Sequence, residues 1–202
     1  MSFRKPHPLA FAAAALLVVV GTAMGAQPSY GPRYAQDRAE IEDLMSRYLF
    51  AMDYGDFDAY AETFTEDGVL EFSRSTSKGR AEIKKAVAAF KEGIGKLYKD
   101  KEGNPATLRH VRLQAVIRVE ADRAWTRSLW VEMANDGPNG TLKMGTFGIY
   151  EDELQRVKGR WLFSKRRVLN EFLEGRHSGP DNPVRDLDGL AEAARGNNVR
   201  PN

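Results

Sequence analysis

Four long stretches of strand-like sequence follow one another in the C-terminal half of the chain, at residues 107–120, 123–135, 141–157 and 160–172. Short segments of turn-forming residues separate them, with Ala-Asp at 121–122, Asn-Asp-Gly-Pro-Asn-Gly at 135–140 and Lys-Gly at 158–159. Consecutive strands joined by tight turns pair antiparallel. The chain is therefore constrained to form a large antiparallel sheet, and such a sheet must bury one face against another layer.

The first of these stretches has a strict alternation of apolar and polar side chains. One parity holds the apolar set Val111, Leu113, Ala115, Ile117 and Val119, and the other parity holds His110, Arg112, Gln114 and Arg118. Alternation of this kind predicts a sheet with one dry face.

The segment before the sheet has the periodicity of helices. Apolar residues recur at spacings of three and four from Asp37 to about Tyr54, at Ile41, Leu44, Met45, Tyr48, Leu49 and Met52. Asp37 is the expected N-cap of this helix, with Glu40 completing a capping box, and Gly55 is the expected stop.

Shorter elements are predicted between this helix and the sheet. Asp56 is placed to cap a short second helix, residues 66–73 read as a strand, and residues 78–90 read as a third helix. Residues 91–106 are polar and contain glycine, which predicts a loop at the rim of a pocket. Helices can cover only one face of the sheet, so we expect an α+β domain whose curved sheet closes over them.

The first 26 residues have the features of a secretory signal. Arg4 and Lys5 precede an apolar run from Leu9 to Val20, and small residues follow the run. The run is shorter than the about 20 residues that span a bilayer. We therefore expect export to the periplasm with cleavage of residues 1–26 and no further membrane contact; an uncleaved amphipathic anchor is the alternative.

The rest of the chain is expected to form one domain between two irregular segments. Residues 27–36 are predicted to be a linker, residues 37–173 the domain, and residues 174–202 a flexible tail, because the tail is rich in Gly, Pro, Asn and charge. Without residues 1–26, Lys plus Arg falls from 30 to 28 and equals Asp plus Glu at 28. The remaining chain has no excess of positive charge that would indicate binding to nucleic acid. The absence of Cys excludes disulfides and thiolate chemistry.

Three segments of this domain resemble the SnoaL-like proteins of the NTF2-like superfamily. They are the helical segment AEIEDLMSRYLFAMDYGDFDAYAETFTEDGVLEF, the hairpin RHVRLQAVIRVEADRAWTRSLWVEM and the closing hairpin MGTFGIYEDELQRVKGRWLFSKRRV. The resemblance covers about residues 37–172. It implies a cone-shaped fold with the N-terminal helices packed in a strongly curved sheet, one small-molecule pocket, and a homodimer or homotrimer. The superfamily contains many enzymes and also non-enzymes, so the fold alone does not fix the activity.

Within the superfamily the chain is most similar to the group of scytalone dehydratase, bile-acid 7α-dehydratase and hexachlorocyclohexane dehydrochlorinase. The resemblance implies that Asp53, at the end of the first helix, and His110, on the first long strand, are catalytic. It also places Tyr48 and Arg166 at substrate-binding positions. We add Trp130 as a candidate for the pocket wall.

Each candidate also has an ordinary structural interpretation. His110 is the one histidine of the predicted domain and a suitable general base at neutral pH, but it could be a hydrogen-bonded strand residue. It has the parity of the polar side chains, so it faces the interior only if the cavity takes the polar register or a bulge intervenes. Asp53 could be a solvated acid before a glycine turn, Tyr48 a core aromatic, and Arg166 a partner in a cross-strand ion pair.

The sequence has no P-loop, nucleophile elbow, dinucleotide fingerprint or metal-ligand spacing. We therefore expect neither cofactor nor metal. The favoured function is a lyase of the dehydratase or dehydrohalogenase type, acting through an Asp53–His110 dyad on a small apolar, possibly cyclic substrate. The alternatives are a non-catalytic periplasmic binding protein, an isomerase and a structural dimer module.

Overall fold

The computed structural model describes residues 30–72, 74–172, 174 and 178–198. The chain order of the elements is α1 Tyr34–Tyr54, α2 Phe57–Glu62, β1 Phe64–Phe72, β2 Ser75–Lys78, α3 Arg80–Leu97, β3 Leu108–Glu120, β4 Arg123–Ala134, the 3₁₀ turn η1 Pro138–Gly140, β5 Lys143–Val157, β6 Arg160–Asn170 and α4 Leu187–Asn198. The predicted signal at residues 1–26 and the first three residues of the predicted linker lie outside these ranges.

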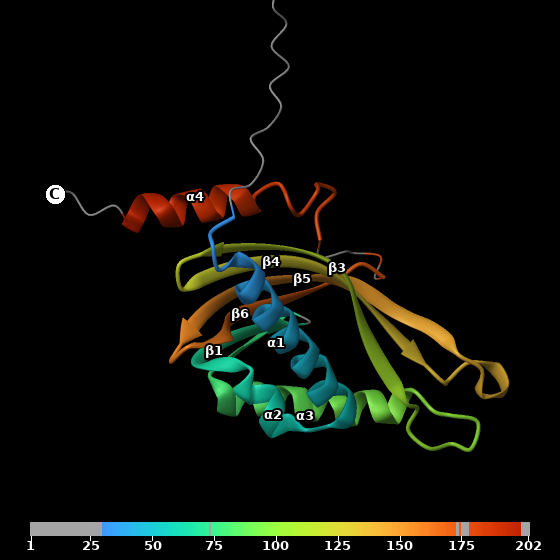
Figure 1. Ribbon diagram of the computed structural model, residues 1–202. Coiled ribbons are helices and arrows are strands. Elements are labelled where there is room, and N and C mark those ends of the chain that lie inside the picture. Colours follow the sequence, from blue (N-terminus) through green and yellow to red (C-terminus); the bar gives the residue numbers. More distant parts are fainter. Residues whose placement is uncertain (1–29, 73, 173, 175–177, 199–202) are drawn as a thin grey trace, which may run out of the picture.

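The six strands form one curved, unclosed sheet in the order β2-β1-β6-β5-β4-β3. All neighbours pair antiparallel except β1 and β6, which pair parallel. Helices α1, α2 and α3 lie on one side of the sheet and α4 lies on the other (Figure 1). The expected α+β fold with helices packed in a strongly curved, mainly antiparallel sheet is confirmed.

Helix α1 fills the concave side of the sheet and supplies much of the core. Its buried residues Ile41, Met45 and Tyr48 pack in one cluster with Ile117 and Phe163 from the strands. The helix ends at Gly55, whose φ of 74° is the left-handed conformation that favours glycine. Because Gly55 ends the helix, it also determines which residues form the last turn of α1, next to the sheet.

The start of α1 differs from the prediction. The helix begins at Tyr34, inside the segment expected to be a linker, and Asp37 lies in its first turn instead of capping it. Asp37 is buried and bonded to the Arg156 guanidinium, which lies over the Trp161 ring. A long-range ion pair uses this carboxylate, and the apolar pattern alone could not indicate it.

Helix α3 is also longer than predicted. It continues to Leu97, so the first part of the expected loop at 91–106 is helical. Ile94 maintains the helical spacing after Val87 and, with Tyr98, packs on a small cluster of Ala106, Leu108 and Ala134. This packing outweighs the cost of the two glycines at 93 and 95, about 1 kcal/mol each relative to alanine.

A bulge in β3 decides which side chains of this strand face the interior. The pairing passes from Arg112↔Trp130 to Ala115↔Ser128, so two residues of β3 lie opposite one residue of β4. Because side chains alternate along a strand, one extra residue exchanges the faces. His110 therefore points to the same side of the sheet as the core residue Ile117, although the two have opposite parity in sequence.

Residues 187–198, part of the segment predicted to be a flexible tail, form α4. Leu187, Ala191 and Ala194 lie against Trp125 on the outer face of the sheet. Asp186 and Asp188, at the start of the helix, pair with Arg127 and Arg118 of the strands. The apolar stripe of α4 contains one leucine and two alanines among glycine, asparagine and charged residues, so the signal in the sequence was weak.

Across the described ranges, no helix has the length and apolar character needed to cross a membrane.

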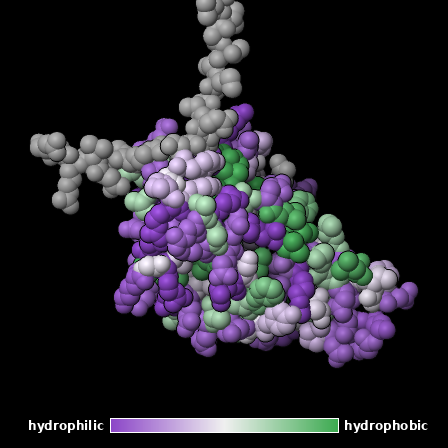
Figure 2. Space-filling model, viewed as in Figure 1, coloured by the Kyte–Doolittle hydropathy of each residue, from purple (hydrophilic) through white to green (hydrophobic). Residues whose placement is uncertain are grey.

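Hydrophobic side chains gather on the surface over β3 and β5, at the right of the space-filling view (Figure 2). The exposed large apolar residues of these strands include Leu113 and Phe147, which are 48% and 45% exposed. Strands β3 and β5 therefore leave apolar side chains exposed to solvent on this side of the molecule.

We predict that Leu187 anchors α4. Leu187 is fully buried, whereas Leu190 in the same helix is 37% exposed. Leu187→Ala should lower the free energy of unfolding in urea by about 2–3 kcal/mol, because it removes buried apolar volume. Leu190→Ala, the matched control, should change it by less than about 0.5 kcal/mol. Equal effects of the two substitutions would show that α4 is not docked through this face.

Candidate active site

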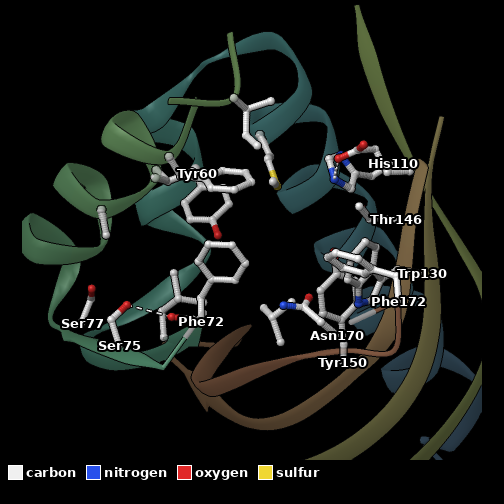
Figure 3. Close-up of a pocket in the computed structure, with 18 of the residues that line it drawn as sticks. Tyr60, Phe72, Ser75, Ser77, His110, Trp130, Thr146, Tyr150, Asn170 and Phe172 are labelled. Carbon is white, nitrogen blue, oxygen red and sulfur yellow. Dashed lines mark hydrogen bonds and ion pairs between the residues drawn. The ribbon is translucent and has the colours of Figure 1, made fainter. Parts of the chain in front are cut away.

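A cavity of about 310 Å³ lies between the sheet and helices α2 and α3. Figure 3 shows His110, Thr146, Trp130 and Tyr150 on one side of the cavity, and Tyr60 and Phe72 on the other. The lining is largely aromatic and aliphatic, and its few polar side chains include His110, Glu132, Thr146, Ser75, Ser77 and Asn170. Such a cavity suits a small apolar molecule with a few polar substituents.

Asp53 and His110 meet at the edge of this cavity. The Asp53 Oδ1 atom lies 2.7 Å from His110 Nδ1, and Asp53 Oδ2 accepts a 2.9 Å hydrogen bond from the His110 backbone N–H. The two side chains are 5% and 6% exposed. The last turn of α1 and the first residues of β3 are thus joined by two hydrogen bonds to one carboxylate.

This contact orients the imidazole. A carboxylate can only accept hydrogen bonds, so a neutral imidazole that donates to it carries its proton on Nδ1 and its lone pair on Nε2. A carboxylate in this position also stabilises the imidazolium that forms when Nε2 takes up a proton. The pair therefore has the geometry of an oriented general base that faces the cavity.

Lys91 of α3 holds the same turn of α1 from the other side. Its ammonium donates a 3.1 Å hydrogen bond to the Asp53 backbone carbonyl. Burial lowers the pKa of Lys91, while the nearby Asp53 carboxylate acts in the opposite direction. A cation at this point offsets the unfavourable position of an acid at the C-terminal end of a helix.

Glu132 is a further polar group of the site, and sequence reasoning missed it. It pairs with His110 across β3 and β4, and its Oε2 lies 3.6 Å from His110 Nε2. Burial raises the pKa of the Glu132 carboxyl, and His110 opposes that shift. The tight turn between β3 and β4 pairs Glu120 with Arg123, a register that would place Met133 opposite His110; the bulge shifts the register by one residue and brings Glu132 there instead.

Arg166 does not line the cavity, contrary to the prediction. It is 1% exposed and makes two hydrogen bonds with Asp152, at 2.7 and 2.8 Å. Its guanidinium lies 4.0–4.3 Å from the ring centres of Tyr48, Tyr150 and Phe163. The alternative interpretation as a cross-strand ion pair is therefore the one that the structure has.

Tyr48 also lies behind the cavity wall and not in it. Its hydroxyl accepts a 2.6 Å hydrogen bond from Tyr60, which does line the cavity. Burial raises the pKa of both phenols. Tyr48 was predicted to contact the ligand. In the structure it is a core residue whose hydroxyl accepts the hydrogen bond of Tyr60.

Trp130 lies in the cavity wall, where its ring stacks on Tyr150 with centroids 5.7 Å apart. Of the lining residues that the structure describes, none is Lys or Arg. The described residues also contain no group of three or more His, Cys, Asp or Glu side chains placed to hold a metal ion. The site thus consists of an oriented imidazole, a buried carboxyl and uncharged walls.

A family model for the SnoaL-like domain matches residues 33–167. No curated protein matches the chain. Among solved structures, a protein of unknown function from Mycobacterium tuberculosis is 24% identical, with a TM-score of 0.59 over 81% of this chain and 96% of its own. A putative scytalone dehydratase from Novosphingobium aromaticivorans is 22% identical, with a TM-score of 0.55 over 75% and 95%. A protein from Catenulispora acidiphila in complex with S-DNPA is 26% identical, with a TM-score of 0.54 over 66% and 94%.

We predict that Arg166 acts on stability. Arg166→Met leaves Asp152 buried without its cation and should lower the free energy of unfolding by about 3–5 kcal/mol. Arg167→Met is the matched control, because Arg167 pairs with Glu71 and Glu151 at the surface of the same strand. It should cost less than about 1 kcal/mol in the same urea titration. A small, equal loss in both variants would contradict the structural role of the Arg166–Asp152 pair.

Proposed function

The chain belongs to the SnoaL-like domain family, and from this premise we propose that it is a cofactor-independent lyase acting on a small, largely apolar molecule. The family includes polyketide cyclases and dehydratases. The observation that carries the proposal is the 2.7 Å contact between Asp53 and His110 at the wall of a cavity. A buried, oriented imidazole beside a pocket for an organic molecule is an arrangement suited to proton abstraction.

In the proposed reaction His110 Nε2 removes a proton from a carbon of the bound molecule. The electrons of the broken C–H bond form a double bond with the adjacent carbon, and the leaving group departs from that carbon with its electron pair. Asp53 stabilises the imidazolium and holds its plane toward the substrate. A placed general base contributes about 10²–10⁴-fold to such a step.

The cavity lining supports a substrate with little charge. Aromatic side chains of Tyr60, Phe72, Phe90, Trp130 and Tyr150 supply flat apolar surface. A volume of about 310 Å³ is at the small end of the range for ligand pockets. A compact ring compound with hydroxyl or carbonyl substituents matches both the size of the cavity and the few polar side chains of its wall.

We also propose that the protein is exported and that it associates as a homodimer or homotrimer. Export rests on the basic, apolar and small-residue order of the first 26 residues. Association has a suitable surface in the exposed apolar residues over β3 and β5 (Figure 2).

Replacement of the proposed base, His110, tests the lyase function. The protein without residues 1–26 is incubated with a panel of cyclic hydroxy ketones and chlorinated ring compounds, and products are identified by mass spectrometry. We expect a product that has lost water or hydrogen chloride, and a decrease in turnover of about 10²–10⁴-fold in His110→Asn and Asp53→Asn. Ser46→Ala, on the exposed side of α1, is the control.

Other outcomes of this experiment separate the alternatives. Unchanged turnover in His110→Asn would refute the proposed mechanism. A product of unchanged mass would identify an isomerase, and retention of a compound without conversion would identify a binding protein.

Export is tested with the full chain in a Gram-negative host. We expect the protein in the periplasmic fraction, with a mass that corresponds to removal of about the first 26 residues. A variant with Leu16 and Leu17 both replaced by Arg should remain in the cytoplasm at full length, because charge interrupts the apolar run. Full-length wild-type protein in the cytoplasm would contradict the proposal.

A further inference from the structure

Glu132 and His110 form an acid and a base on one wall of the cavity. They occupy directly opposite positions of β4 and β3, so both side chains point to the same side of the sheet, and both line the cavity. Their nearest polar atoms, Oε2 and Nε2, are 3.6 Å apart. A substrate carbon that presents a hydrogen to Nε2 therefore presents the substituent of its neighbouring carbon within reach of Glu132.

The surroundings of Glu132 favour its protonated form. Its side chain is 4% exposed, and Oε1 has no hydrogen-bond partner among the described residues. Burial is the main reason for the raised pKa of this carboxyl, and the acids Asp53 and Asp136 add to it. His110 and Thr146 act against the shift, and the cations of Lys91 and Lys143 also interact with Glu132. A buried carboxyl with a raised pKa is suited to act as a hydrogen-bond and proton donor.

Resting on the proposed function, we propose that Glu132 is the general acid for a departing hydroxyl group, so that the protein dehydrates uncharged alcohols. Hydroxide is a poor leaving group unless it receives a proton as the C–O bond breaks. Chloride leaves as a stable anion and needs no acid. The described lining offers chloride no cation, whereas it offers a hydroxyl a carboxyl with an unused oxygen.

His110 and Glu132 together account for both protons that move in the reaction. His110 Nε2 takes the proton from carbon, the C–H electrons form the double bond, and the C–O bond breaks as Glu132 gives its proton to the oxygen. Water and an alkene result, and the protein holds an imidazolium beside a carboxylate. Transfer of the proton from Nε2 back to Glu132 restores both groups, so no other reactant is consumed.

The lack of a cation in the described lining limits the substrate class. An anionic substrate would find no Lys or Arg among these residues to compensate its charge, and Asp53 lies behind His110. Burying such a charge without a partner is strongly unfavourable. We therefore expect neutral hydroxylated ring compounds to bind, and their carboxylated analogues to be excluded.

The first experiment does not depend on turnover. Infrared difference spectra of wild type minus Glu132→Gln, recorded across pH, report the protonated carboxyl of Glu132 directly. We expect its C=O band to be present at neutral pH and to disappear as pH rises through the raised pKa. A band that is absent at neutral pH would overturn the assignment of Glu132 as an acid.

The second experiment uses matched pairs of a cyclic β-hydroxy ketone and the β-chloro ketone with the same carbon skeleton. Glu132→Gln should lower turnover of the hydroxy compound by about 10²–10⁴-fold and change that of the chloro compound by less than about threefold. Glu132→Asp should retain part of the hydroxy activity, and Glu153→Gln, an exposed acid on β5, is the control. Far-UV circular dichroism verifies that each variant is folded.

The outcomes distinguish the two proposals. Equal losses with both compounds in Glu132→Gln would overturn the role of Glu132 and leave the dyad intact. Unchanged turnover of both compounds in His110→Asn would refute the proposed function itself, as would the absence of turnover by the wild type on every pair. Wild-type activity on the hydroxy compound should also fall as pH rises, because Glu132 must be protonated, and this decrease should be missing for the chloro compound.

Discussion

The packing of α1 into the concave side of the sheet is the constraint on which the rest of the structure depends. Ile41, Met45 and Tyr48 bury one face of the helix against the strands, and this contact keeps the sheet curved and unclosed. The same packing carries the last turn of α1 to the start of β3. Asp53 reaches His110 because the helix ends there and not one turn earlier or later. The core and the site are thus consequences of one interface.

The interior holds two buried ionic groups with different roles. Arg166 and Asp152 are joined by two hydrogen bonds within a shell of aromatic rings, and neither lines the cavity. The side chains of Asp53, His110 and Glu132 are also largely buried, but two of the three line the cavity, and one oxygen of Glu132 is unpaired. An ion pair enclosed away from the cavity contributes structure, whereas a polar group that lines the cavity can act on a ligand. Burial alone does not separate these cases; the position relative to the cavity does.

Local patterns in the sequence predicted the elements well, because strand alternation, helical spacing and turn residues are local signals. The four long strands, the Asp56 cap of α2 and the Gly55 stop are where those signals place them. The misses have non-local causes. Asp37 is used by Arg156, far along the chain, and α4 is held by a side chain of another element, Trp125. Tyr48 and Arg166 could line the cavity or pack behind its wall, and only the tertiary structure decides between the two. Neither composition nor spacing predicts that outcome.

The bulge between Arg112 and Ala115 has a consequence for how this strand can vary. Side chains of one sequence parity change from one face of β3 to the other at the bulge. The number of residues between the turn and His110, and not their chemical type, therefore determines which face the imidazole is on. Leu113, at the bulge, is half exposed, so the bulge does not depend on burying its side chain in the core. In homologous or engineered chains, the length of this strand should therefore be a better guide to an intact site than the identity of the residues within the bulge.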